Sequence, residues 1–300
     1  ELDKEQLLEI SDIIKKENAE VIVAVGGGKV IDTGKIAADR SNRPVIVVPT
    51  IASTDAPCSG CAVTYTEKAE FEKVHYQKLN PAIVLVDTKI IASAPVRFLI
   101  AGMGDALATW FEARSCAVSS SSNECGGSST LAGQTIARLC YNVLIENGVQ
   151  AINDCRSGVI SPAIERIIEA NILLSGIGFE SGGLASAHAI HNGLTALPET
   201  HEYFHGEKVA FGVLAGLFIS GAEQQEIDEV YNFCLSVGLP VKLSDLGISG
   251  KGQEKLMIVA QKTCEPGSSI HHENYTITPT VVLEAILVAD SYGSRTTFGS

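Results

Sequence analysis

The chain has 300 residues, of which 45% are hydrophobic and 19% are charged, and this balance is typical of a globular protein with a large buried core. Its formal net charge of −13 argues against binding to nucleic acid or to anionic membranes, because both require a basic surface. No stretch approaches the roughly 18 consecutive apolar residues of a membrane-spanning helix. A chain of this length is sufficient for two domains.

Residues 1–94 alternate between helical and strand patterns. The apolar run VIVAV is typical of a strand buried on both faces of a parallel sheet, and a glycine turn and a helix follow it. This order predicts an α/β domain, 1–94, that contains part of a doubly wound parallel sheet. Helices are predicted at 3–17 and 29–40, strands at 21–25, 44–49 and 82–87, and a hairpin-like stretch at 58–79.

After Pro95 the spacing of apolar residues becomes helical, so residues 95–300 are predicted to form an α-helical second domain without a significant sheet. The Ser- and Gly-rich segment 119–129 is predicted to be a loop. The predicted helices of this domain are 96–116, 129–147, 161–179, 183–195, 206–220, 224–237, 251–263 and 280–292.

Eight cysteines are scattered along the chain without the spacing of a disulfide framework. Cys58 and Cys61 have no second pair with which to complete a zinc site built from cysteines alone. We therefore predict reduced thiols and a cytoplasmic location, because disulfides are rare in that compartment.

The stretch GGGKVIDTGK, residues 26–35, begins just after a predicted strand and opens a helix. Three consecutive glycines would let the backbone approach a phosphate closely, beside the free N–H groups of the helix N-terminus. The spacing is neither that of the dinucleotide fingerprint nor that of a P-loop, so a structural turn is the alternative.

A second polar stretch, PTIASTDAPCSGCAVTY, also lies at the carboxyl end of a predicted strand. Its hydroxyl and N–H groups are suited to pyrophosphate or ribose. The carboxylate of Asp55 could accept hydrogen bonds from a substrate hydroxyl. A polar turn capped by this aspartate is the structural alternative.

Asp105 lies in GMGDALATWFEAR, between two glycines and an apolar helical run. An aspartate at the start of a helix is usually a cap, but the surrounding Ala, Leu and Trp residues predict burial. A buried carboxylate needs a partner, which a cation or a metal ion would provide.

The segment ESGGLASAHAIHNGL places His188 and His191 three residues apart, on one side of a predicted helix. His205 follows at the start of another helix. Taken alone, such histidines could be packed core residues. An aspartate and two histidines from these stretches would form a ligand set suited to Zn²⁺ or Fe²⁺, and three protein ligands leave the open position that a catalytic metal requires.

These stretches resemble the NAD-dependent glycerol dehydrogenases of the iron-containing, or group III, alcohol dehydrogenase superfamily. The resemblance covers nearly the whole chain, and it implies a dehydroquinate synthase-like fold with a cofactor domain followed by a helical metal-binding domain. The similar segments are GGGKVIDTGK, PTIASTDAPCS, VDTKIIASAP, GMGDALATWFEAR, ERIIEANILLSGIGFESGGLASAHAIHNGLTALP and HGEKVAFG.

The resemblance also implies roles for individual residues. Asp105, His188 and His205 match the ligands of a metal that is usually zinc. Asp55 matches a residue that contacts the polyol, and His191 matches a histidine near the metal that is not a ligand, so these two are assigned to catalysis. The residues assigned to NAD binding are Gly26, Gly27, Gly28, Lys29, Asp32, Thr50, Ser53, Ser59, Cys61 and Tyr65.

The chain departs from the family pattern at two places. Family members begin earlier, with strands of the cofactor domain and an acidic residue that engages the adenosine ribose. We therefore expect an N-terminally incomplete cofactor domain, with an uncovered sheet edge and a half-built adenine pocket. The sequence HHEN at 271–274 replaces the family's His-Asn-Met, so His271 and His272 receive no role, and His201 is treated as a surface residue.

The implied reaction is the oxidation of glycerol, or of a related vicinal diol, to dihydroxyacetone, with NAD as the hydride acceptor and a metal as Lewis acid. A homo-oligomer is expected. The alternatives are a related iron-dependent alcohol dehydrogenase, an enzyme of phosphorylated substrates, and an inactive metal- or nucleotide-binding protein. Phosphorylated substrates call for a basic cluster, whereas Lys208 is the only basic residue close in sequence to one of the ligands.

Overall fold

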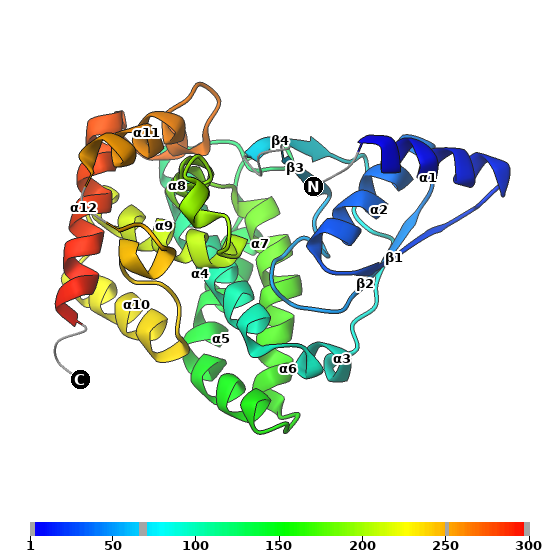
Figure 1. The fold of residues 1–300 in the computed structure, drawn as a ribbon, viewed down its shortest axis with the longest axis horizontal. Coiled ribbons are helices and arrows are strands. Elements are labelled where there is room, and N and C mark those ends of the chain that lie inside the picture. Colours follow the sequence, from blue (N-terminus) through cyan, green and yellow to red (C-terminus); the bar gives the residue numbers. More distant parts are fainter. Residues whose placement is uncertain (1–3, 66–70, 250–251, 297–300) are drawn as a thin grey trace.

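The computed structural model describes residues 4–65, 71–249 and 252–296. Figure 1 shows an α/β part, drawn in blue at the right, beside a larger helical part. The boundary predicted between residues 94 and 95 falls between α3 and α4. Whether the two parts fold as separate domains stays a prediction.

A three-stranded parallel sheet forms the centre of the α/β part, in the strand order β1-β2-β5. Ile22 pairs with Val45, and Ile46 pairs with Ile83. A separate antiparallel hairpin, β3-β4, occupies the predicted hairpin-like stretch. The elements are α1 (Lys4–Lys16), β1 (Ile22–Gly26), α2 (Gly28–Ser41), β2 (Val45–Pro49), β3 (Cys61–Tyr65), β4 (Phe71–Tyr76), β5 (Ile83–Val84) and α3 (Thr88–Ser93).

The prediction that the first strand is buried on both faces is wrong. Only Ala24 of β1 is buried, whereas Val23 and Val25 are 53% and 54% exposed. Helix α2 covers one face, where Gly34 lies so close that a Cβ there would be 2.6 Å from the Cβ of Ala24. Among the described residues, no element covers the opposite face of this strand as closely as α2 covers the first face.

The second part is helical, as predicted, and Figure 1 shows α4 among the other long helices near its centre. One apolar core runs through these helices. They are α4 (Val96–Ser119), α5 (Leu131–Arg156), α6 (Pro162–Glu169), α7 (Ser175–Gly182), α8 (Ser186–Leu194), α9 (His205–Ile219), α10 (Gln224–Val237), α11 (Gln253–Thr263) and α12 (Pro279–Thr296), with short 3₁₀ turns at Pro198–Thr200, Leu243–Leu246 and Ser269–His272.

Two helix predictions need correction, and one helix was not predicted. The helix predicted at 129–147 continues to Arg156, and the one at 161–179 is divided by a π-helical turn at Ala170–Leu174. Helix α3 was not predicted. The sequence feature that could have predicted α3 is Asp87, a residue type that is preferred at helix N-termini. Its side chain accepts hydrogen bonds from the backbone N–H groups of Lys89 and Ile90 and so caps the helix.

The segment 119–129 contains a loop, as predicted, that follows the end of α4. Asn123 holds it together, because its side-chain oxygen accepts the N–H groups of Cys125 and Gly127 at 3.1 and 2.9 Å. The amide of Asn123 also donates to the carbonyl of Ser181, which ties the loop to α7.

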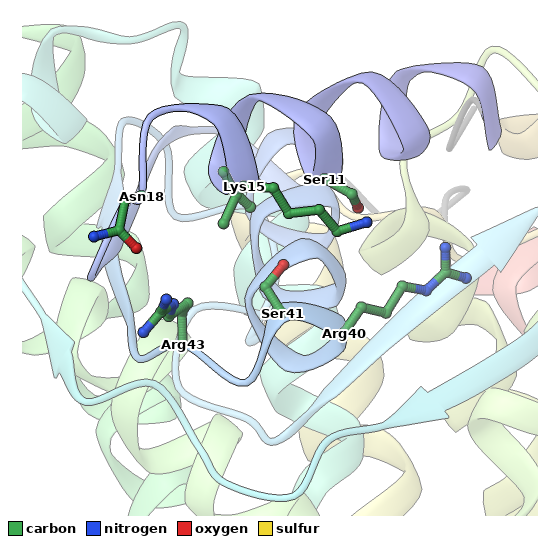
Figure 2. Close-up of a pocket in the computed structure, with 7 residues that line it drawn as sticks. Ser11, Lys15, Asn18, Arg40, Ser41 and Arg43 are labelled. Atoms are coloured by element: carbon green, nitrogen blue, oxygen red, sulfur yellow. The ribbon is translucent and has the colours of Figure 1, made fainter.

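Two surface cavities of about 450 and 430 Å³ lie in the α/β part. Figure 2 shows the first, between the ends of α1 and α2, where Lys15, Arg40 and Arg43 contribute to its lining. Lys15 and Arg40 belong to the last turns of their helices, where positive charge interacts favourably with the free carbonyl groups. The helix ends thus account for the basic character of this cavity.

Two further predictions concern disulfides and membrane spans. All eight cysteines are free thiols in the structure. In the part of the chain that the structure describes, no helix is both long and apolar enough to cross a membrane.

Candidate metal centre

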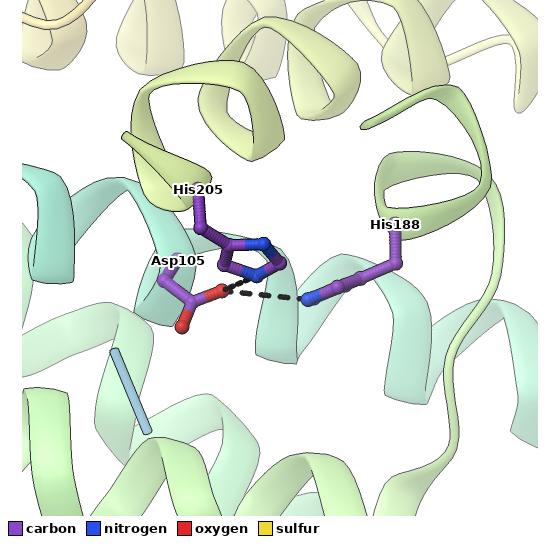
Figure 3. A group of neighbouring side chains, drawn as sticks. All are labelled: Asp105, His188 and His205. Atoms are coloured by element: carbon purple, nitrogen blue, oxygen red, sulfur yellow. Dashed lines mark ion pairs between the residues drawn. The ribbon is translucent and has the colours of Figure 1, made fainter. Parts of the chain in front are cut away.

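Asp105, His188 and His205 come together from three helices, as Figure 3 shows. The Nε2 atom of His205 lies 3.0 Å from Oδ1 of Asp105, and Nε2 of His188 lies 3.4 Å from the same oxygen. One ligand atom from each residue lies within 4.8 Å of the others. The three side chains are therefore close enough to share one metal ion.

The chemistry of this cluster fits a divalent metal. Asp105 is only 1% exposed, and its Oδ1 atom is buried without a hydrogen-bond partner, although both imidazoles face it. Burial alone would raise the pKa of this carboxyl, but His205 and His188 hold it well below its usual range. An ionised, buried oxygen beside two imidazole nitrogens is a donor set that suits zinc or iron.

Close backbone packing brings α9 to α4 at the cluster. A Cβ atom on Gly206 would overlap the carbonyl oxygen of Ala101 and lie 2.9 Å from the backbone nitrogen of Asp105. The start of α9 is also fixed by Glu207, whose carboxylate accepts the N–H of Phe204 at 2.7 Å and pairs with Arg97. His205 is thus held beside Asp105 by the backbone itself.

Glu112 is a component of the site that the sequence reasoning missed. It is 1% exposed, and its Oε2 atom lies 2.6 Å from Nδ1 of His188. Its Oε1 atom accepts the backbone N–H groups of Ala185 and His188, both at 2.9 Å. A signal was available, because Glu112 follows Asp105 by seven residues, which places both carboxylates on one face of α4.

His191 is buried and lies behind His205 rather than in the ligand cluster. Its Nε2 atom is 3.0 Å from Nδ1 of His205, and its own Nδ1 atom is 3.0 Å from the side-chain oxygen of Asn192. Burial and the neighbouring His205 lower the pKa of His191 well below its ordinary value. A neutral His191 can therefore accept a hydrogen bond from His205 and donate one to Asn192.

Asp55 lies directly beside the cluster. Its backbone N–H donates to Oδ2 of Asp105 at 3.2 Å, and its Oδ2 atom accepts a hydrogen bond of 2.8 Å from Ser175. Ser175 in turn lies 3.0 Å from the hydroxyl of Thr109. Burial and the nearby Asp105 raise the pKa of Asp55 to about 8. Neither Ser175 nor Thr109 was predicted from the sequence.

The glycine turn between β1 and α2 forms a second component. Helix α2 begins at Gly28 with Gly27 as its N-cap, and among the described residues no side-chain hydrogen bond is made at this cap. A Cβ atom on Gly27 would lie 2.9 Å from the side chain of Ile51, and the N–H of Thr50 donates to Gly26. Uncapped N–H groups beside a glycine turn fit a phosphate group. Because Thr50 and Ile51 belong to the polar stretch that carries Asp55, these contacts place the turn next to that stretch.

The chain is similar to proteins of one known family. The profile of the family described as iron-containing alcohol dehydrogenase matches residues 1–88. The chain is 50% identical over 293 residues to the glycerol dehydrogenase of Thermotoga maritima, which covers 98% of this chain and 80% of that protein. The chain belongs to the iron-containing alcohol dehydrogenase family.

Two further relatives place the chain within the family. The crystal structure of a probable glycerol dehydrogenase from Sinorhizobium meliloti 1021 superposes with a TM-score of 0.95 at 46% identity, covering 98% of this chain and 83% of that one. A glycolaldehyde reductase from Halobacterium salinarum is 43% identical over 98% of this chain and 81% of its own. The helical and α/β parts of the chain thus have the family's fold.

The remaining residues assigned to NAD lie on α2, on the stretch after β2 and at the end of β3. Lys29 is exposed on the first turn of α2, and Thr50 and Ser53 are half-buried. Asp32 accepts the N–H of Val63 at 3.4 Å, and burial raises its pKa to about 6. The side chain of Tyr65 lies outside the described residues.

Three further histidines lie away from the cluster of Asp105, His188 and His205. His201 is exposed, as expected, and a ring nitrogen lies 2.9 Å from the carbonyl of Thr195. His271 is exposed as well, whereas Nδ1 of His272 lies 2.7 Å from the carbonyl of Leu184. The structure gives these residues contacts with the backbone and none with Asp105.

Lys35 organises the polar stretch that carries Asp55. The side chain is fully buried, and its ammonium group donates to the carbonyls of Ala56 and Cys61 and lies 3.3 Å from the hydroxyl of Ser59. Ser59 and the carbonyl of Cys61 therefore face Lys35, which anchors the turn that carries Asp55. Lys35 is the last residue of the glycine motif GGGKVIDTGK, but the motif predicted no role for it.

Replacing Lys35 with methionine should lower the free energy of unfolding by about 2–3 kcal/mol, because buried carbonyl groups would lose their donor. NADH binding should weaken too, since the turn would no longer be anchored. Chemical denaturation and NADH fluorescence would measure both effects. Lys16→Met, at an 82% exposed side chain, is the matched control, and equal stability of the two variants would contradict this role.

Proposed function

We propose that this member of the family is a metal-dependent oxidoreductase that converts glycerol and related vicinal diols to dihydroxyacetone and its analogues, with NAD as the hydride acceptor. The observation that carries the proposal is that His188 and His205 both face one buried oxygen of Asp105. The backbone N–H of Asp55 donates a hydrogen bond to the other carboxylate oxygen of the same aspartate. The 50% identity to the Thermotoga maritima glycerol dehydrogenase supports glycerol as the substrate.

Two sets of residues would hold the cofactors. Asp105, His188 and His205 would bind a divalent metal, and the turn at 26–28 with the N-terminus of α2 would bind the pyrophosphate of NAD. When bound, the metal supplies Lewis-acid activation of a hydroxyl group, and NAD supplies the hydride acceptor. The protein positions the diol between them.

Asp55 would orient the diol. Its backbone is tied to Asp105 and its side chain to Ser175, so the carboxyl group has a fixed position next to the ligand cluster. One carboxyl oxygen remains to bind a substrate hydroxyl. His191 would assist by holding the ring of His205 in place through the contact between its Nε2 atom and Nδ1 of His205.

Replacing Asp55 with asparagine should raise the KM for glycerol by about tenfold or more, because a hydrogen bond to a charged or ionisable group is worth about 1.5–3 kcal/mol. The Kd for NADH should change much less, since Asp55 lies on the metal side of the site. Steady-state kinetics and NADH fluorescence would test this. Equal losses of glycerol use and NADH binding would mean that Asp55 does not mark the substrate position.

We also propose zinc as the metal, with ferrous iron as the alternative. The Asp/His/His donor set suits both ions, and the proposal rests on the resemblance to glycerol dehydrogenases. Metal analysis of the purified protein, followed by chelation and re-addition of each ion, would distinguish them. Full recovery of activity with iron alone would overturn the assignment of zinc.

Glycerol-dependent reduction of NAD⁺ is the direct test of the function. The purified chain should reduce NAD⁺ with glycerol and 1,2-propanediol, lose this activity on chelation and regain it with metal. Glycerol 1-phosphate should be a poor substrate, because Lys208 is buried and its ammonium group lies 3.4 Å from the carbonyl of Thr200. Metal binding without turnover would instead favour an inactive metal-binding protein.

The 43% identity to a glycolaldehyde reductase favours a second candidate, the reduction of a hydroxyaldehyde by NADH at the same site. The residues would be the same, because the reduction runs the same hydride transfer in reverse. Comparing kcat/KM for glycerol oxidation with that for glycolaldehyde reduction would decide which reaction this chain favours.

We propose a homo-oligomer in the cytoplasm. Exposed apolar side chains in both parts of the chain, including Val23, Leu79 and Leu131, support self-association because they would be buried at an interface. The mass in solution, measured by light scattering, would test the assembly.

A further inference from the structure

We propose that Glu112 is the positioning residue of the metal centre, fixing the ring of His188 with its proton on Nδ1 so that Nε2 presents a lone pair to the metal. This inference rests on the metal centre of the proposed function but not on the identity of the substrate. The observation behind it is the 2.6 Å contact between Nδ1 of His188 and Oε2 of Glu112.

The hydrogen bonds of Glu112 place a proton on one nitrogen of the His188 ring. An ionised carboxylate only accepts hydrogen bonds, and Oε1 of Glu112 already receives the N–H groups of Ala185 and His188. The contact at Oε2 therefore requires a proton on Nδ1 of His188. A neutral ring with its proton there has a lone pair on Nε2, the atom that faces Oδ1 of Asp105 at 3.4 Å.

The placement of Glu112 makes this arrangement rigid. Asp105 and Glu112 lie on the same helix, α4, about two turns apart, so one rigid element carries a ligand and the group that orients a second ligand. Because Glu112 also binds two backbone N–H groups at the start of α8, it fixes the backbone of His188 as well as its ring. Carboxylate–histidine–metal arrangements of this kind set ring orientation and ligand basicity.

The charge balance of the metal centre gives a second, independent reason to assign this role to Glu112. With two neutral imidazoles, a divalent cation is neutralised by two carboxylates, and Asp105 and Glu112 are both 1% exposed. Burying a carboxylate is costly unless it is paired and hydrogen-bonded. Glu112 is therefore suited both to orient His188 and to complete the charge of the site.

The chain offers a matched control for a test by substitution. Glu273 is also a buried carboxylate bound to the start of α8, accepting the N–H of Ser186 at 3.3 Å and the hydroxyl of Ser115 at 2.9 Å. It differs from Glu112 in having no hydrogen bond to a ligand histidine. A comparison of variants at the two glutamates therefore distinguishes a loss of support for α8 from a loss of orientation of His188.

Zinc affinity, measured by competition with a chromophoric chelator, should fall about 10- to 100-fold in Glu112→Gln and change less than about threefold in Glu273→Gln. The apo forms should be compared first by thermal unfolding, so that a folding defect is recognised. Unchanged zinc affinity in Glu112→Gln, or an equal loss in both variants, would overturn the assignment.

A measurement on the unmodified protein tests the same inference without any variant. With ¹⁵N-labelled histidine, long-range ¹H–¹⁵N spectra of the zinc form should show His188 protonated at Nδ1 and coordinated through Nε2. The opposite tautomer would overturn the inference even if zinc binds. Failure of the unmodified protein to bind any divalent metal would contradict the proposed metal centre, whereas tight binding without glycerol oxidation would contradict only the proposed function.

Discussion

Replacing His205 with alanine is expected to remove the bound metal and to lower the turnover of glycerol by at least about a thousandfold. The reason is that Lewis-acid activation of a hydroxyl contributes several kcal/mol, and each 1.4 kcal/mol changes the rate about tenfold. Asp105 and His188 alone would leave an incomplete ligand set. The fold should persist, because the side chain of His205 is 24% exposed and contributes little to the apolar core.

Metal content by elemental analysis and kcat by NADH absorbance would measure this effect, with circular dichroism as a check on folding. His201→Ala is the matched control, since that ring is exposed and lies outside the ligand cluster. A His205→Ala protein that retains one metal per chain would show that the ligand assignment is mistaken.

Replacing Gly206 with alanine should destabilise the protein by about 1–3 kcal/mol or more and should weaken metal binding. The added Cβ would overlap the carbonyl oxygen of Ala101 and press against the nitrogen of Asp105. Overpacking of this kind forces backbone shifts, and here the shift would separate His205 from Asp105. One methyl group would thus change a site whose ligands are all still present.

Thermal unfolding and zinc affinity of Gly206→Ala would be compared with those of Gly252→Ala. A Cβ at Gly252 meets no atom within 4 Å, so this control adds the same methyl group without a clash. Equal stability of the two variants would imply that α9 and α4 can separate freely, and the rigid approach inferred here would be wrong.

Most of the architecture was predictable because local patterns determine it. The period of apolar residues changes near Pro95, and the parallel sheet and the helical part follow that change. The π-helical turn at Ala170–Leu174 was not predictable, because its sequence is as helical as that of its neighbours. Burial of β1 was overestimated for a related reason: an apolar run does not show how many faces of a strand are covered.

The chemistry of the candidate site was predictable only in its residue types. The segments that carry Asp105, His188 and His205 stood out because ligand-type residues interrupt apolar helices. The resemblance to glycerol dehydrogenases selected these three residues as ligands, and the structure brings all three together. Glu112 did not stand out, since a glutamate in a helix is ordinary until its surroundings are known. Lys35 was overlooked for the same reason, although it is fully buried.

By itself, the sequence determined the order of most of the elements, the glycine turn at 26–28 and the set of residues able to bind a metal. These features depend on neighbours along the chain or on the chemistry of single side chains. The tertiary structure decided which two histidines face Asp105, which one stands behind His205, and that Glu112 contacts the ring of His188. Those roles depend on distances of a few ångströms between helices that are far apart in sequence, and only the packing of α4, α8 and α9 sets them.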